Sequence, residues 1–87
     1  MAERKQTAAA AYQARRRDIE RLLDMLKEEV AHHAEFAAKD SRNWGFAGDL
    51  GHVRELLVEA LAFLAQQEPG DVVRRLQEET TRKEGRS

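Results

Sequence analysis

The sequence predicts an all-α fold. We expect an antiparallel helix–loop–helix hairpin with a long first helix and a short C-terminal helix, two copies of which pair into a homodimeric helical bundle. Residues 7–39 contain neither glycine nor proline, apolar residues recur at steps of three, four and seven, and no stretch alternates as a strand would. At 87 residues the chain has room for one domain, which we place over 1–87 with frayed ends.

The first helix is predicted over residues 7–39, where the strong helix formers Ala, Arg, Glu, Leu and Lys dominate. Thr7 is suited to the N-cap, because its hydroxyl can accept a hydrogen bond from an unpaired amide of the first turn. At about 1.5 Å per residue this helix would be roughly 50 Å long. Its apolar stripe consists of Tyr12, Ile19, Leu22, Leu23, Leu26, Val30, Ala34 and Ala37.

The second helix is predicted over residues 50–67, with Asp49 as its N-cap. Pro69 should end it, because proline cannot continue the hydrogen-bond ladder. The expected core between the first two helices comprises Leu22, Leu26, Val30, Val53, Leu57, Leu61 and Leu64. Asp71 is then expected to cap a short third helix over 72–83, which has three apolar residues, Val72, Val73 and Leu76.

The corner at 40–49 contains the only tryptophan, Trp44, together with Phe46, Gly45 and Gly48. We expect the two aromatic residues to fold under the hairpin and close its core, with the glycines supplying the positive φ angles of a tight turn. The alternative is that they form an exposed anchor for a partner protein. A second helix that starts near Asn43 would instead enclose three glycines at about 1 kcal/mol each, which favours the loop.

A difference in length between the helices predicts self-association. The second helix would measure only about 27 Å, so it could cover little more than half of the first. In an antiparallel hairpin, an alanine-rich stretch over 8–19 that includes Tyr12 would then have no intrachain neighbour. A second copy would cover it in a four-helix bundle or a larger helical assembly.

The charge distribution suggests an alternative partner for the N-terminal end. Residues 1–17 carry five basic side chains and one acid, a local net of +4, although the whole chain has a net charge of −1. Nucleic acid could contact this end through its phosphates, in which case the protein would be a nucleic-acid-associated accessory protein. The arginines that we assign to this alternative are Arg15, Arg16, Arg17 and Arg21.

Glutamate and histidine residues suggest a second alternative, a metal-binding helical bundle. Glu29 and His32 have the Glu-x-x-His spacing of carboxylate metal sites in helical bundles, and His33 and His52 could join them in a dimer. Such spacing also arises by chance in a glutamate-rich helix, where the same side chains form solvated pairs. We favour these pairs and expect no metal and no cofactor.

Other classes of function find little support. There is no cysteine, and no apolar run approaches the roughly 18–20 residues of a membrane span. No nucleophile motif suggests an enzyme, and we expect a cytoplasmic location. The sequence therefore predicts a small non-enzymatic helical interaction or scaffolding protein that binds itself and can bind another protein. Tyr12, Trp44 and Phe46 are its expected partner-binding residues.

Overall fold

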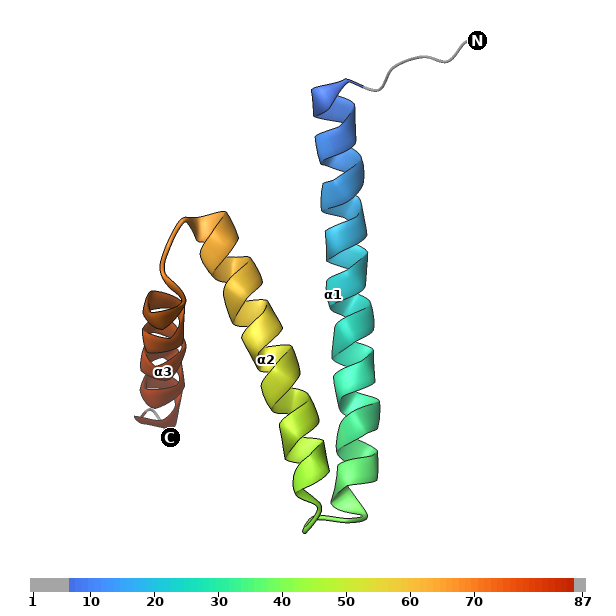
Figure 1. The fold of residues 1–87 in the computed structure, drawn as a ribbon, viewed down its shortest axis with the longest axis vertical. Helices are drawn as coiled ribbons and strands as arrows, with labels where there is room; N and C mark the ends of the chain where they lie inside the picture. Colours follow the sequence, from blue (N-terminus) through green and yellow to red (C-terminus); the bar gives the residue numbers. More distant parts are fainter. Residues whose placement is uncertain (1–6, 86–87) are drawn as a thin grey trace. The chain divides into compact units, whose positions relative to one another are not determined.

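The computed structural model describes residues 7–85, and the side chains of 7–83. This part of the chain forms three helices and no strand (Figure 1), which confirms the predicted all-α fold. The chain divides into two compact units, Met1–Arg42 and Asn43–Ser87. Residues 1–6 and 86–87, which belong to the ends expected to fray, lie outside the described residues.

The first unit contains a single long helix, α1 (Ala8–Ala38), of 31 residues. Its bounds lie within one residue of the predicted ones. Thr7 is the N-cap, as predicted: its backbone is extended and its Oγ1 accepts a hydrogen bond from the backbone N–H of Ala10 at 3.0 Å. The helix is uninterrupted along its length (Figure 1) and ends at the C-cap Lys39.

The second helix, α2 (Trp44–Ala65), begins one and a half turns earlier than predicted. Asn43 is its N-cap in place of Asp49, and the Asn43 Oδ1 accepts a hydrogen bond from the backbone N–H of Gly45 at 2.8 Å. Once this cap has fixed the first turn, each further residue adds a backbone hydrogen bond at little cost. The corner expected at 40–49 is therefore limited to 39–43.

Gly45 and Gly48 adopt helical conformations, so the prediction that they form a turn is wrong. Gly45, Gly48 and Gly51 all lie inside the helix, and no described glycine has a positive φ. The residue with a left-handed backbone conformation is instead Gln66, the C-cap of α2, with φ 57°. Its N–H donates to the carbonyl groups of Ala62 and Phe63, which completes the last turn.

The third helix, α3 (Pro69–Gly85), is longer at both ends than the predicted 72–83. Proline is well suited to the first helical position, where its missing N–H would have had no partner. Asp71 therefore lies within the first turn and is not the N-cap. Its Oδ2 accepts a hydrogen bond from the Glu68 N–H at 3.4 Å, the return half of a capping box.

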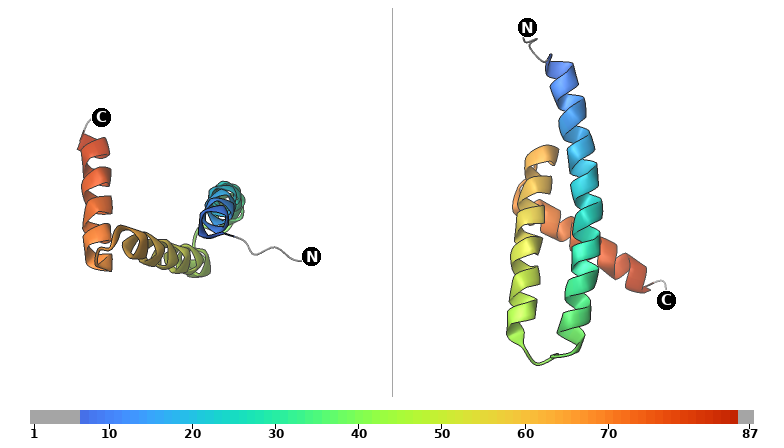
Figure 2. Two further views of the ribbon diagram at one scale, coloured as in Figure 1. Left: turned by 90° about the horizontal axis from the view of Figure 1, so that it is seen from above. Right: turned by 90° about the vertical axis from the view of Figure 1, so that its right-hand side faces the viewer.

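Helix α3 docks on α2 through its first turn. Ala62 of α2 and Val72 of α3 are 5% and 4% exposed, and they are the only buried apolar residues in the described part of the chain. Beside them, the Arg75 Nη1 donates to the Gln67 Oε1 at 2.9 Å. Leu76, one turn further, is already 43% exposed. Figure 2 shows the reason: α3 leaves the end of α2 at a steep angle instead of running back along it.

The seven residues of the expected core are divided between the two units, on α1 and on α2. Leu26 and Val53 are half-buried. The other five are exposed, from 38% for Val30 to 75% for Leu64. The described part of the first unit has no second helix that could cover the members on α1, so a core between α1 and α2 stays a prediction. The exposed members are Leu22, Val30, Leu57, Leu61 and Leu64.

Replacing Gly48 or Gly51 by alanine should stabilise the protein by about 0.5–1 kcal/mol, because alanine restricts the unfolded chain more than glycine does. A Cβ atom at either position meets nothing within 4 Å. Urea unfolding followed by circular dichroism measures the change. Gly45→Ala is the matched control, since its Cβ would lie 3.0 Å from the Asn43 Oδ1 and disturb the cap. Destabilisation by G48A or G51A would show that something packs closely against these glycines.

Replacing Val72 by alanine should release α3 and cost about 1–2 kcal/mol of stability, because it removes two buried methyl groups. A free helix of 17 residues is marginal in water. We therefore expect lower helical content and faster tryptic cleavage after Arg74 and Arg75. Thr81→Ala, an exposed substitution on the same helix, is the control. Equal cleavage rates in the two variants would contradict docking through Val72.

Candidate interaction surfaces

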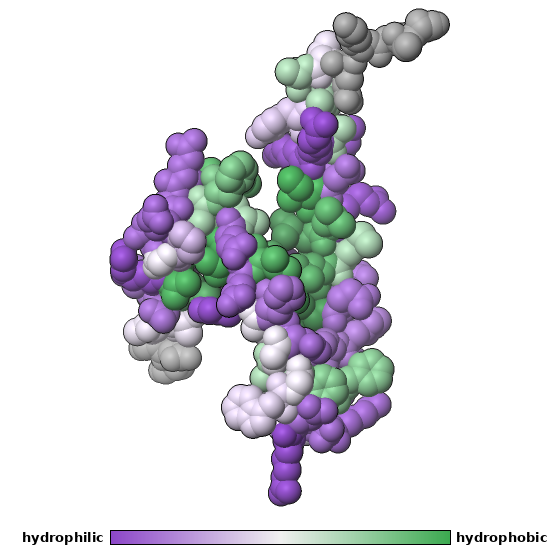
Figure 3. All heavy atoms as spheres, in the orientation of Figure 1, coloured by the Kyte–Doolittle hydropathy of each residue, from purple (hydrophilic) through white to green (hydrophobic). Residues whose placement is uncertain are grey.

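Helix α1 presents an apolar stripe that the structure leaves exposed. Tyr12, Ile19, Leu23 and Val30 are 66%, 50%, 47% and 38% exposed. At about 100° per residue, these four positions fall within one side of the helix. On the visible face in Figure 3, apolar side chains cover the middle of α1 and hydrophilic ones lie toward its ends. This stripe is the more extended of two candidate interaction surfaces.

Helix α2 carries large apolar residues on more than one side. Leu57, Leu61 and Leu64 follow one stripe, and all three are exposed. Leu56 and Phe63 are 51% and 82% exposed and are separated by seven residues, so they define a different side of the helix. Ala62, which packs against α3, lies on a third side of α2. Apolar residues therefore cover more of α2 than contact with a single neighbouring helix needs.

The aromatic residues of the corner do not act together as predicted. Trp44 is the first residue of α2 and is 85% exposed, so it does not close a core. Phe46 is half-buried. Two residues apart on a helix, the two side chains point in directions about 200° apart. The exposed-anchor interpretation of Trp44 agrees with its exposure, but a partner at Trp44, Phe46 or Tyr12 remains a prediction.

The arginines near the start of α1 do not form a flat basic patch. Arg15, Arg16 and Arg17 are consecutive on the helix, so their side chains point in three directions around it. Arg16 is also engaged: its Nε lies 3.2 Å from the Glu20 Oε2 in an exposed ion pair. Arg21 is exposed as well. Nucleic-acid binding at this end stays a prediction.

The described residues bring together no group of three or more histidine and acidic side chains that could hold a metal ion. Glu29, His32 and His52 are exposed, and His33 is half-buried. The metal site considered from the sequence needs two copies of the chain, so the alternative stays untested.

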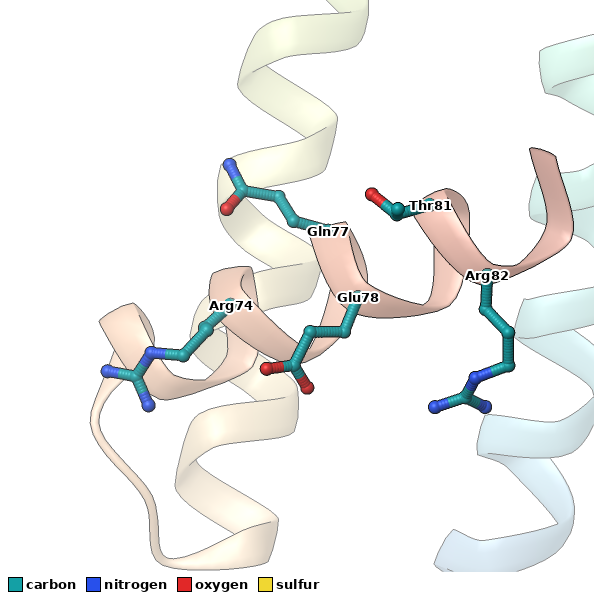
Figure 4. Close-up of a pocket in the computed structure, with 5 residues that line it drawn as sticks. All are labelled: Arg74, Gln77, Glu78, Thr81 and Arg82. Carbon is teal, nitrogen blue, oxygen red and sulfur yellow. The ribbon is translucent and has the colours of Figure 1, made fainter. Parts of the chain in front are cut away.

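A shallow depression on α3 was not anticipated from the sequence. Figure 4 shows its lining, which comes entirely from this one helix: Arg74, Gln77, Glu78, Thr81 and Arg82. Two of these side chains are held by neighbours on the same helix, Arg74 by Asp71 at 3.2 Å and Arg82 by Glu79 at 3.7 Å. A lining from one convex helix gives no opposing wall, so this feature lacks the concave shape of a ligand site.

Sequence reasoning also missed Phe36, which is 61% exposed near the end of α1. The Lys39 Nζ lies 5.5 Å from the centroid of its ring, a cation–π contact at an exposed site. Phe36 lies to one side of the apolar stripe, so the spacing of that stripe did not indicate it.

None of the described helices is long and apolar enough to cross a membrane.

Comparison with known proteins adds no functional assignment. No protein-family model matches the chain, and no curated protein or solved structure is significantly similar to it.

The exposure of Trp44 can be tested directly, because it is the only tryptophan. We expect its fluorescence maximum to resemble that of free tryptophan in water, and acrylamide to quench it nearly as efficiently, because most of the indole is in contact with solvent. The Trp44→Phe variant supplies the background signal. A blue-shifted, weakly quenched emission would show that the corner is covered.

Proposed function

We propose that this chain is a small, non-enzymatic helical interaction or scaffolding module that acts by binding further copies of itself. The observation that supports the proposal most strongly is the imbalance between buried and exposed apolar residues. Only Ala62 and Val72 are buried in the described part of the chain, whereas fifteen large apolar residues are exposed. Large contiguous apolar surface on a soluble protein is characteristic of interaction sites.

The surface of α2 explains why one chain is insufficient. The side of α2 at Ala62 packs against α3. The stripe of Leu57, Leu61 and Leu64 remains exposed, as do Leu56 and Phe63, which lie about 120° further round the helix. In a hairpin, α1 could cover the stripe. Leu56 and Phe63 would still need a neighbour, and the chain has no fourth helix to supply one in its described part.

The helix lengths support the same conclusion. Helix α1 has 31 residues and α2 has 22, so α2 could shield about two thirds of α1 even in full antiparallel contact. Helix α3 begins only three residues after Gln66, and its apolar residues end at Leu76. A helical bundle made of two or more chains would bury the remaining apolar surface, as four-helix bundles do.

A mass measurement tests the proposal. Sedimentation equilibrium over a wide range of concentrations should give a mass at least twice the 9.9 kDa of one chain. The double variant Leu56→Ser/Phe63→Ser should lower the mass or weaken the association, because it removes apolar surface that one chain leaves uncovered. Gln77→Ser, a substitution at an exposed polar position, should leave the mass unchanged. A mass of 9.9 kDa for the unmodified protein at all concentrations would refute the proposal.

A further inference from the structure

Six of the eight residues in the apolar stripe of α1, all but Leu22 and Ala34, have a spacing that is the same from either end of the helix. We define this stripe as the α1 band, the six residues Tyr12, Ile19, Leu23, Leu26, Val30 and Ala37. The steps between them are 7, 4, 3, 4 and 7 residues. The pattern is symmetric about a point between Asp24 and Met25, close to the middle of the 31-residue helix.

The six positions of the band also lie on one side of the helix. At about 100° per residue they fall within an arc of roughly 60°. Two helices that carry such a band can therefore pair antiparallel. Each residue of the band then faces a band residue of the second copy at the same distance from the midpoint. A twofold axis at the midpoint would set Tyr12 opposite Ala37 and Ile19 opposite Val30 of the second copy, with Leu23 opposite Leu26 at the centre.

Charge selects the antiparallel direction. Every Asp, Glu, Lys or Arg within residues 8–17 is an arginine, and every one within 28–38 is a glutamate. Parallel pairing would place the arginines beside their own copies, and like charges in close apposition oppose association. Antiparallel pairing brings the arginine end of each helix beside the glutamate end of the other.

We propose that the α1 band is the contact surface for a second copy of this chain, and that two α1 helices pair antiparallel about a twofold axis between Asp24 and Met25. The pairing specifies the partner and the geometry of the self-association proposed above and rests on that proposal. The band is available for it: Tyr12, Ile19, Leu23 and Val30 are exposed, and Leu26 and Ala37 are half-buried.

Cysteine cross-linking tests the direction and the register, because the chain has no cysteine of its own. Tyr12→Cys and Ala37→Cys proteins are mixed, allowed to exchange subunits by unfolding and refolding, and oxidised mildly. We expect the main covalent dimer to join one Y12C chain to one A37C chain, as identified by mass spectrometry. Each variant alone should give little dimer, since equivalent positions would lie about 37 Å apart along antiparallel helices.

A matched control pair has the same symmetry about the midpoint of α1 but lies on another side of the helix. Ala14→Cys and Glu35→Cys are also symmetric about the midpoint, but they lie outside the arc of the α1 band, so this pair should cross-link poorly. Ile19→Cys with Val30→Cys provides a second test pair if a substitution at Tyr12 or Ala37 disturbs folding, which circular dichroism would reveal.

The outcomes separate this inference from the proposed function. Covalent Y12C–Y12C dimers would indicate parallel helices and overturn the inference. A dimeric mass without any cross-link at either test pair would also overturn it, while self-association itself would stand. A monomeric mass would overturn both.

Discussion

An α-helix can remove its apolar side chains from water only by packing against a neighbour, and this requirement governs the whole molecule. Burial of apolar surface is the main favourable term in folding. The described part of this chain has three helices, and the only apolar side chain of α3 that is buried there is Val72, in its first turn. Most large apolar residues of α1 and α2 are exposed, and we propose that association with further copies of the chain covers them.

The local signals at helix ends have a direct effect on that surface. Asn43 starts α2 at Trp44, so Gly45, Phe46 and Gly48 become part of the helix and not of a loop. This extension lengthens the apolar stripe of α2 at its N-terminal end. At the other end, Gln66 in the left-handed conformation and Pro69 at the start of α3 turn the chain sharply. The turn sends α3 away from α2 (Figure 2) and leaves Leu64 and Phe63 uncovered.

The elements with strong periodicity were predictable from sequence, and those decided by competition between local signals were not. The bounds of α1 and its cap at Thr7 followed from composition and capping preference alone. The start of α2 did not, because the cost of three helical glycines was weighed against a turn without counting the strength of the Asn43 cap. Of the candidate surfaces, the apolar stripe of α1 could be predicted from the spacing of its apolar residues. The separate side at Leu56 and Phe63 was not, because the expected core followed one side of the second helix and included neither residue.

If association supplies the missing neighbours, folding and assembly must be coupled, and stability must depend on protein concentration. The midpoint of thermal unfolding, measured by circular dichroism over a roughly hundredfold range of concentration, tests this most directly. We predict that the midpoint rises steadily with concentration. A midpoint that stays constant over that range, with a cooperative transition, would show that one chain is stable alone and would contradict the account.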